Sequence, residues 1–206
     1  MDKRRKGKLI KLFEYVKKGS KGFNVDSVKP HLDIFIDYGS KCKTITEFGV
    51  ETGCSTVAFL ISGVKKMYSY DVIVTPNARL VKDAADEDGV YFKLYEKDNL
   101  KVNIKKTDLL FIDTDHWYGQ IKAELTHHHQ RVNKWIMMHD TETFGLINPF
   151  DGRPGMKAAI YEFLEEHPEW QIKEHFVIGH GLTVLERTDK AKRKWFWFRG
   201  KDFSIF

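Results

Sequence analysis

The sequence predicts an α/β fold in which helices cover both faces of a mostly parallel sheet. Segments with the apolar pattern of strands alternate with segments of helical spacing along most of the 206 residues. Strands that are joined by helical crossovers lie parallel in a sheet. The last two strand segments instead follow one another across Gly179-His180-Gly181, which predicts a hairpin. Together these observations predict a doubly wound, seven-stranded sheet with an antiparallel hairpin strand at its C-terminal end.

The first half of the chain predicts three strands and three helices. In order, they are a helix at 27–40, a strand at 43–49, a helix at 54–63, a strand at 67–72, a helix at 75–89 and a strand at 90–96. The helix at 75–89 has the clearest ends, because Thr75 can cap its first turn, Pro76 suits its first position and Gly89 closes it. Residues 1–25 precede these elements as a basic N-terminal extension.

The second half predicts four strands and two helices. In order, they are a strand at 108–114, a helix at 116–132, a strand at 134–140, a helix between Pro154 and Pro168, and strands at 170–179 and 180–188. Proline cannot continue a helix interior, so the two prolines bound the last helix. Because the chain shows no linker and no internal repeat, we expect one domain over 1–206, with a basic, aromatic tail at 189–206.

Charge is distributed unevenly along the chain. The net charge is +5, yet residues 1–22 and 187–206 hold 16 of the 34 Lys and Arg residues and only four of the 29 acids. The two ends therefore carry +12 together, and the middle of the chain carries −7. Basic ends suit contact with nucleic acid, an anionic lipid head or an acidic glycan, or they simply keep the protein in solution.

The composition excludes several protein classes. Hydrophobic residues make up 42% of the chain and charged residues 31%, which is typical of a globular domain. No apolar run approaches the roughly 20 residues of a membrane span, and the charged N-terminus lacks the apolar stretch of a secretory signal. Two cysteines, Cys42 and Cys54, exclude a disulfide framework. We therefore expect a cytoplasmic protein with reduced thiols.

A glycine loop follows the first predicted strand, in the run Glu47-Phe48-Gly49-Val50-Glu51-Thr52-Gly53-Cys54-Ser55. Ligands of open α/β sheets bind at the carboxyl ends of the strands, where glycine lets the backbone approach them closely. A dinucleotide fingerprint needs glycine where Glu51 stands, so a pyrophosphate would meet a carboxylate there. The ammonium, carboxylate and sulfonium of S-adenosylmethionine suit a loop that offers Glu47 beside free amides. The loop favours this cofactor over a nicotinamide dinucleotide, although a purely structural turn stays open.

Acidic residues follow the next two strands. Asp71 ends the strand at 67–72, where a carboxylate can hydrogen-bond ribose hydroxyls. Asp98 and Asn99 follow the strand at 90–96 as candidates for an adenine amino group, although Asp-Asn is also a common turn. The residues expected to bind the cofactor are Glu47, Gly49, Glu51, Gly53, Ser55, Asp71, Asp98 and Asp113.

Acids and histidines end the fourth and fifth predicted strands. Asp113 and His116 follow one strand and Asp140 ends the other, and both strand ends face the ligand crevice. Carboxylates at such close range raise one another's pKa unless a cation lies between them. Either Asp113 and Asp140 hold a divalent ion such as Mg²⁺, or His116 or a carboxylate acts as a base toward a hydroxyl. We predict His116, Asp113 and Asp140 as the catalytic residues.

These segments resemble class I S-adenosylmethionine-dependent methyltransferases. The stretch DLLFIDTDHWYGQIKAEL, followed by KWIMMHD, is similar to motifs of sugar O-methyltransferases and of the group related to cephalosporin hydroxylase, and EFGVETGCS resembles their first motif. The resemblance covers residues 40–190. It implies a Rossmann-like fold whose last strand is inserted antiparallel, which separates these enzymes from dehydrogenases. It also implies that S-adenosylmethionine is bound by Glu47, Gly49, Ser55, Asp71 and Asp113.

A fainter similarity links the chain to catechol-type O-methyltransferases, whose fourth strand ends in a metal-binding Asp. This similarity implies a metal at Asp113 or Asp115 and at Asp140. The chain departs from that group at Thr141, where the group has Asn, and the sugar group often has glycine at the position of Thr114.

We therefore expect S-adenosylmethionine-dependent O-methylation of a small-molecule or glycan hydroxyl. A nucleic-acid methyltransferase that uses the basic ends, and a non-catalytic binding module of the same fold, stay open as alternatives. The loop at 141–153 and the N-terminal helix are expected to form the acceptor pocket. The aromatic run 195–198 suits a ligand or a dimer contact, which leaves a homo-oligomer open. The run 127–129, three histidines, is expected to be a solvated helix end, since consecutive helical residues cannot converge on one ion.

Overall fold

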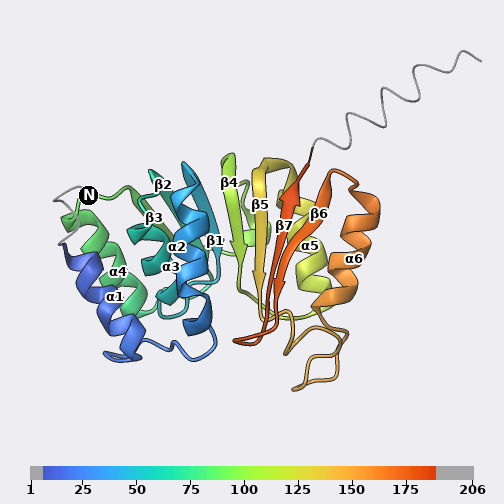
Figure 1. The fold of residues 1–206 in the computed structure, drawn as a ribbon, viewed down its shortest axis with the longest axis horizontal. Helices are drawn as coiled ribbons and strands as arrows, with labels where there is room; N and C mark the ends of the chain where they lie inside the picture. Colours follow the sequence, from blue (N-terminus) through green and yellow to red (C-terminus); the bar gives the residue numbers. More distant parts are fainter. Residues whose placement is uncertain (1–6, 189–206) are drawn as a thin grey trace, which may run out of the picture.

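A seven-stranded mixed sheet forms the centre of the computed structural model, which describes residues 7–188 (Figure 1). The strands are β1 (Thr44–Phe48), β2 (Lys66–Asp71), β3 (Phe92–Glu96), β4 (Thr107–Ile112), β5 (Val132–His139), β6 (Trp170–Phe176) and β7 (Leu182–Arg187). They lie in the order β3-β2-β1-β4-β5-β7-β6. The first five are parallel, and β7 is antiparallel to both of its neighbours. The predicted doubly wound sheet with an antiparallel C-terminal hairpin is confirmed.

The central strands are buried on both faces. β1 and β4 pair in parallel, with Ile45 opposite Leu109. Along β4, Leu109 and Phe111 pack into one half of the core, and Leu110 and Ile112 pack into the other. Side chains alternate in this way because a strand has a period of two residues. Burial on both faces explains why β4 is a continuous apolar run in the sequence.

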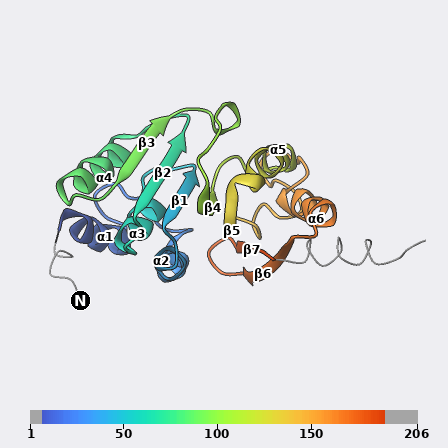
Figure 2. The same ribbon diagram turned by 90° about the horizontal axis from the view of Figure 1, so that it is seen from above.

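Helices cover the two faces of the sheet. In the described residues they are α1 (Lys8–Lys18), α2 (Leu32–Ser40), α3 (Cys54–Ile61), α4 (Pro76–Glu87), α5 (Tyr118–His128) and α6 (Met156–Glu166), with short 3-10 turns at η2 (Lys29–His31), η3 (Asn99–Lys101) and η4 (His129–Arg131). The first four helices pack on one face and α5 and α6 on the other, as Figure 2 shows. Thr75 caps α4 as predicted, since its side chain accepts a hydrogen bond from the amide of Ala78. No helix in this part of the chain is long and apolar enough to cross a bilayer.

Helix α1 lies within the stretch that was expected to be an extension. Leu9, Leu12, Phe13 and Val16 are buried at helical spacing and join the core that α3 and α4 share. The apolar stripe is present in the sequence, but the lysines between its members dominate the composition of the segment. Residues 1–6 and the tail at 189–206 lie outside the described residues, so the alternatives of nucleic-acid contact, dimer contact or solvated ends stay open there.

The carboxyl ends of the five parallel strands share one edge of the sheet, the lower edge in Figure 1. The strand order reverses between β1 and β4, which creates the crevice where ligands of such sheets bind. The loop that follows β5 projects beyond this edge, and the turn between β6 and β7 lies beside it (Figure 1). The fold therefore brings the predicted site residues to a common edge.

Candidate active site

The loop between β1 and α3 brings the backbone of Gly49 against the end of β4. A Cβ atom at Gly49 would lie 1.8 Å from the carbonyl oxygen of Asp113, so a side chain has no room there. Gly49 also has a φ of +79°, in the left-handed region that glycine adopts at low cost. Glu51 adopts the same region, with a φ of 47°, although it carries a side chain. Glycine at position 49 is thus required by contact between two strand ends.

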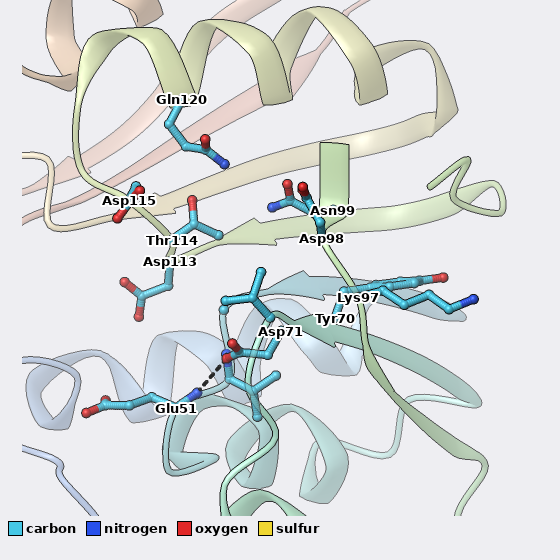
Figure 3. Close-up of a pocket in the computed structure, with 13 residues that line it drawn as sticks. Glu51, Tyr70, Asp71, Lys97, Asp98, Asn99, Asp113, Thr114, Asp115 and Gln120 are labelled. Carbon is cyan, nitrogen blue, oxygen red and sulfur yellow. Dashed lines mark hydrogen bonds between the residues drawn. The ribbon is translucent and has the colours of Figure 1, made fainter. Parts of the chain in front are cut away.

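Asp71, the last residue of β2, holds this loop from the side. Its Oδ2 accepts hydrogen bonds from the amides of Val50 at 2.7 Å and Glu51 at 3.1 Å, and its Oδ1 accepts one from the amide of Ile73 at 3.1 Å. Figure 3 shows the carboxylate of Asp71 directed at the loop, with the Glu51 contact dashed. Oδ2 already accepts two hydrogen bonds, but Oδ1 accepts only one and has a further acceptor site, so Asp71 can hold the loop and still meet a ribose hydroxyl.

A pocket of about 270 Å³ opens beside Asp71. Its lining residues are Gly49, Val50, Glu51, Tyr70, Asp71, Val72, Lys97, Asp98, Asn99, Asp113, Thr114, Asp115 and Gln120. Figure 3 shows Gln120 extending from α5 on the side of the pocket away from Asp71, with Asp98 and Asn99 following β3. Asp98 caps η3 by accepting a hydrogen bond from the amide of Leu100 at 3.0 Å, whereas the side chain of Asn99 is buried. Five of the predicted cofactor residues therefore line one pocket.

Glu124 of α5 lies behind this pocket, and sequence reasoning missed it. Its Oε1 accepts hydrogen bonds from the side chains of Asn99 at 2.5 Å, Thr114 at 2.8 Å and Gln120 at 2.9 Å. All three donors line the pocket, while Glu124 is fully buried. Burial raises the pKa of Glu124 to about 7, against the opposing effect of the three hydrogen bonds. The available signal was weak: an acid on the buried face of a predicted helix.

A second pocket of about 600 Å³ adjoins the first and shares Gly49, Val50, Glu51 and Asp113 with it. Its other lining residues are Asn24, Ser27, Val28, Thr52, Cys54, Ser55, His116, Asp140, Thr143, Phe144, Phe150 and His180. The loop at 141–153 and the segment before α2 thus both contribute to its walls. The rings of Phe144 and His116 are stacked, with centroids 4.6 Å apart and planes at 28°.

Glu47 and Gly53, which were predicted to bind the cofactor, line neither pocket. Glu47 is fully buried and accepts hydrogen bonds from the hydroxyls of Ser55 at 2.7 Å, Thr56 at 2.8 Å and Ser69 at 2.6 Å. Burial raises the pKa of Glu47 to about 7. Ser55 reaches the second pocket, but its hydroxyl donates to Glu47. The prediction assumed that an acid at a strand end faces the ligand, whereas Glu47 is turned toward α3 and β2.

The three predicted catalytic residues come together at the second pocket. Nε2 of His116 lies 3.2 Å from Oδ1 of Asp113 and 3.3 Å from Oδ2 of Asp140. His139, which was not predicted, completes the cluster: its Nδ1 lies 2.9 Å from Oδ1 of Asp140 and 3.5 Å from Oδ1 of Asp113. Behind it, Nε2 of His139 lies 3.2 Å from Nδ1 of the buried His31. The sequence signal for His139 was its place beside Asp140 at the end of β5.

Opposite charges stabilise one another in this cluster despite burial. Burial alone would lower the pKa of His139, but Asp113 and Asp140 outweigh it and raise that pKa to about 10. Burial would raise the pKa of Asp113, yet His139 and His116 hold it well below its usual range. The pKa of His116 is raised, because its hydrogen bond to Asp113 and the charge of both carboxylates outweigh burial. Protonated His139 thus supplies a cation between the two acids.

The same atoms can hold a metal ion. One ligand atom each from Asp113, His139 and Asp140 lie within 4.8 Å of one another. Nδ1 of His139 and Oδ1 of Asp140 are buried and, although close, are not aligned for a hydrogen bond, which fits a site completed by a ligand. An imidazole nitrogen beside carboxylates suits Mn²⁺, Fe²⁺ or Zn²⁺ better than the Mg²⁺ expected from the carboxylates alone. A bound ion would displace the proton of His139, so the two occupants exclude each other.

Backbone strain is concentrated around the second pocket. Four described residues other than glycine have a positive φ, and three of them line this pocket: Glu51 at 47°, Asp140 at 61° and His180 at 65°. Each such conformation costs on the order of 1 kcal/mol or more, so the surrounding structure must impose it. Strain of this kind is common where a protein positions groups for a ligand.

No protein-family model and no curated protein matches the sequence. Solved structures do match the fold. A methyltransferase of Podospora anserina with bound S-adenosylhomocysteine is 18% identical, with a TM-score of 0.60 over 92% of this chain and 89% of that one. The 1,6-didemethyltoxoflavin N1-methyltransferase of Burkholderia thailandensis is 11% identical, with a TM-score of 0.62 over 88% and 87%. The magnesium protoporphyrin IX methyltransferase of Synechocystis is 14% identical, with a TM-score of 0.59 over 87% and 94%.

This chain shares the fold of these solved structures. The similarity to the Podospora anserina structure covers 92% of this chain. At these identities the similarity establishes the fold alone. N-methyltransferases are among the matching structures, so the fold does not distinguish transfer to oxygen from transfer to nitrogen. That distinction depends on the residues of this chain's own site.

Proposed function

We propose that the protein is an S-adenosylmethionine-dependent methyltransferase that acts on a hydroxyl of a small molecule or glycan. One observation carries the proposal: Gly49, Glu51 and Asp113 line both pockets, so a ligand in the first pocket borders the cluster around His116 in the second. The shared fold supports it, because matching methyltransferases were solved with S-adenosylhomocysteine bound. The finer resemblance to sugar O-methyltransferases and the cephalosporin-hydroxylase-like group is part of this proposal.

The first pocket offers groups for each part of S-adenosylmethionine, which supplies an electrophilic methyl group when bound. In this proposal Asp71 binds the ribose hydroxyls, and Asp98 and Asn99, which line the same pocket, meet the adenine amino group. Glu51 and Asp113 stand where the two pockets meet, so their carboxylates suit the cationic methionine end. In this proposal the buried Glu47, with Ser55 and Gly53, shapes the loop without touching the cofactor.

Transfer to a hydroxyl requires removal of its proton, and His116 is placed to accept it. Because Nε2 of His116 lies against Asp113 and Asp140, Nδ1 is the nitrogen left for the acceptor. In this proposal the hydroxyl proton would pass to Nδ1 of His116 as the oxygen bonds to the methyl group that S-adenosylmethionine would supply, and the leaving thioether would keep the electron pair of the broken carbon–sulfur bond. The two carboxylates orient the ring and stabilise the imidazolium that forms.

A metal ion at Asp113, His139 and Asp140 is the second candidate for this step, favoured because Nδ1 of His139 is buried beside both carboxylates without an aligned hydrogen bond. It would lower the pKa of the acceptor hydroxyl and orient it. Methyl transfer measured after treatment with EDTA distinguishes proton removal by His116 from activation by the metal ion. Transfer that survives assigns the proton to His116, whereas transfer that is lost and returns with Mn²⁺ assigns activation to the ion.

The second pocket favours an acceptor without negative charge. Glu51, Asp113 and Asp140 contribute carboxylates, and no Lys or Arg is among the described residues that line it. A phosphate-rich acceptor needs cationic partners, so this lining counts against a nucleic acid. The rings of Phe144 and Phe150, which are 5.8 Å apart, offer apolar faces for an aromatic ring or a sugar.

Titration calorimetry with S-adenosylhomocysteine tests the cofactor. We expect Asp71→Ala to weaken binding at least tenfold, and Asp37→Ala, which removes an exposed acid of α2, to leave it unchanged. Transfer of a labelled methyl group is then measured with phenols, sugars, amines and RNA. Absence of S-adenosylhomocysteine binding would overturn the proposal. Binding without transfer to any acceptor would favour the non-catalytic module, and transfer only to RNA would favour the nucleic-acid alternative.

A further inference from the structure

His129, His167 and Glu169 lie together at the edge of the sheet opposite the candidate active site. His129 begins η4 just before β5, while His167 and Glu169 lie between α6 and β6. β5 and β6 run in the same direction, because each is antiparallel to β7. Their amino ends therefore share one edge, and the two pockets described above are at the other.

The three histidines of the run 127–129 have separate partners, as helical geometry requires. Nε2 of His127 lies 3.1 Å from the carbonyl oxygen of Val102, and Nε2 of His128 lies 3.0 Å from that of Asn99. The prediction that this run is a solvated helix end is wrong for His128 and His129, which are both buried. Among the described histidines of this run, His129 alone faces a second histidine from elsewhere in the chain.

The geometry at His129 is that of a metal ligand. Its Nδ1 lies 2.9 Å from the carbonyl oxygen of Leu125, so Nδ1 carries the proton and donates it there. The lone pair of Nε2 is then free for a ligand. A carbonyl that holds the second nitrogen in this way is the usual support of a metal-binding histidine. Burial lowers the pKa of His129, which keeps the ring neutral, as a ligand must be.

The other two side chains are near enough to complete a site. The rings of His129 and His167 have centroids 4.2 Å apart, and Nδ1 of His167 lies 3.7 Å from Oε1 of Glu169. One ligand atom from each residue lies within 4.8 Å of the others. Tetrahedral ligands of one Zn²⁺ lie about 3.3 Å apart, so closure needs shifts on the order of 1 Å. His167 and Glu169 are partly exposed and can make these shifts, whereas His129 is fixed.

We propose that His129, His167 and Glu169 form a site for a divalent transition metal, with Zn²⁺ the best fit, separate from the candidate active site. Two imidazoles and one carboxylate are a ligand set that zinc takes in proteins, with a fourth position for water. The bound ion would tie the turn before β5 to the turn before β6 and so stabilise the fold. The proposal does not depend on the function proposed above.

Zinc stoichiometry measured by titration calorimetry tests the site in the full chain. We expect wild type to bind one more Zn²⁺ per chain than His167→Ala, and Glu169→Gln to bind that ion at least tenfold more weakly. His127→Ala, a change in the same histidine run, is the control and should match wild type. Zn²⁺ should also raise the melting temperature of wild type by more than it raises that of His167→Ala.

The Asp113–His139–Asp140 cluster is a second possible zinc ligand set, and the double variant Asp113→Asn, Asp140→Asn removes it. In that background, we expect one Zn²⁺ per chain, and Co²⁺ should give the strong visible absorption of tetrahedral coordination. If the background binds no Zn²⁺, or if His167→Ala binds as much as wild type, the proposal is overturned. The two histidines would then be part of an aromatic cluster with Phe163.

Discussion

Nδ2 of Asn99 donates a hydrogen bond of 2.5 Å to Oε1 of Glu124, which joins the turn after β3 to the buried face of α5. The same oxygen accepts the hydrogen bonds of Thr114 and Gln120, so one carboxylate positions three side chains of the first pocket. The remaining oxygens, Oε2 of Glu124 and Oδ1 of Asn99, are buried without a hydrogen-bond partner. Buried unpaired oxygens cost free energy, so this arrangement is not the one that stability alone would select.

Glu124→Ala should weaken the binding of S-adenosylhomocysteine about tenfold or more. The change removes the acceptor that Asn99, Thr114 and Gln120 share, and a hydrogen bond to a charged group is worth about 1.5–3 kcal/mol. Titration calorimetry measures the effect. Glu162→Ala is the matched control, because Glu162 pairs with Lys122 on the exposed side of α5 and α6 and lines neither pocket. Equal affinities for the two variants would contradict a positioning role for Glu124.

Glu124 should also make stability fall as pH rises. Its pKa is about 7 in the folded protein against an ordinary value of 4.5, so between these values the folded chain keeps a proton that the unfolded chain has released. The free energy of unfolding therefore decreases as the pH rises through this window, by about 1.4 kcal/mol per pH unit. Glu124→Gln keeps an acceptor and removes the titration. Urea denaturation should show this variant gaining stability relative to wild type, on the order of 3 kcal/mol, between about pH 4.5 and pH 7.5.

A relative stability of Glu124→Gln that is constant over this pH range would show that Glu124 does not titrate there. Glu47 has a raised pKa of the same sign, so the comparison between variant and wild type is what isolates Glu124. Glu47→Gln should also gain stability relative to wild type over this pH range. The two gains in the free energy of unfolding should add, because Glu47 and Glu124 share no hydrogen-bond partner.

The sheet could be predicted from the sequence because short segments of the chain specify its strands, its helices and its hairpin turn. Strand β4 is a continuous apolar run, α4 has Thr75 and Pro76 at its start, and the hairpin has glycines at its turn. Helix α1 was missed because lysines separate its four buried residues, and burial against α3 and α4 is a tertiary effect. Helix propensity and amino-acid composition do not reveal that a segment rich in lysine packs against the core.

The site could be predicted only where a strand end faces the crevice. Asp113, His116 and Asp140 were predicted as a group because the carboxyl ends of β4 and β5 meet. Glu47 follows the same rule in sequence, yet its carboxylate is turned inward to three hydroxyls. Glu124 is in a helix, so its link to Asn99 depends on packing between distant segments. Strand position predicts the edge of the sheet, but not the side to which a side chain turns.

His116→Gln should reduce methyl transfer with little effect on the cofactor. His116 lines the second pocket and not the first, so the affinity for S-adenosylhomocysteine should stay within about twofold of wild type. Loss of a general base lowers kcat by about 10²–10⁴-fold. Steady-state assays with the acceptor found in the labelled-methyl screen measure kcat. His127→Gln should behave as wild type. If the kcat of His116→Gln were unchanged, His116 would not be the base, and activation of the hydroxyl by a metal ion would be favoured instead.

Gly49→Ala and Gly89→Ala form a matched pair that separates backbone strain from the contact between β1 and β4. Both glycines have a left-handed φ, +79° and +67°, so an alanine costs about 1–2 kcal/mol of strain at either position. A Cβ at Gly89 meets nothing within 4 Å, whereas at Gly49 it would lie 1.8 Å from the carbonyl oxygen of Asp113. Backbone must therefore move at Gly49, and the shift reaches Asp113, which lines both pockets.

We expect Gly49→Ala to lose about 1–3 kcal/mol more of the free energy of unfolding than Gly89→Ala, which is the usual cost of overpacking. Urea denaturation measures this difference. Gly49→Ala should also lose S-adenosylhomocysteine binding under conditions where it is still folded, whereas Gly89→Ala should bind as wild type. If Gly49→Ala were as stable as Gly89→Ala and bound the ligand normally, the close approach of the two strand ends would not be what places the loop at the pocket.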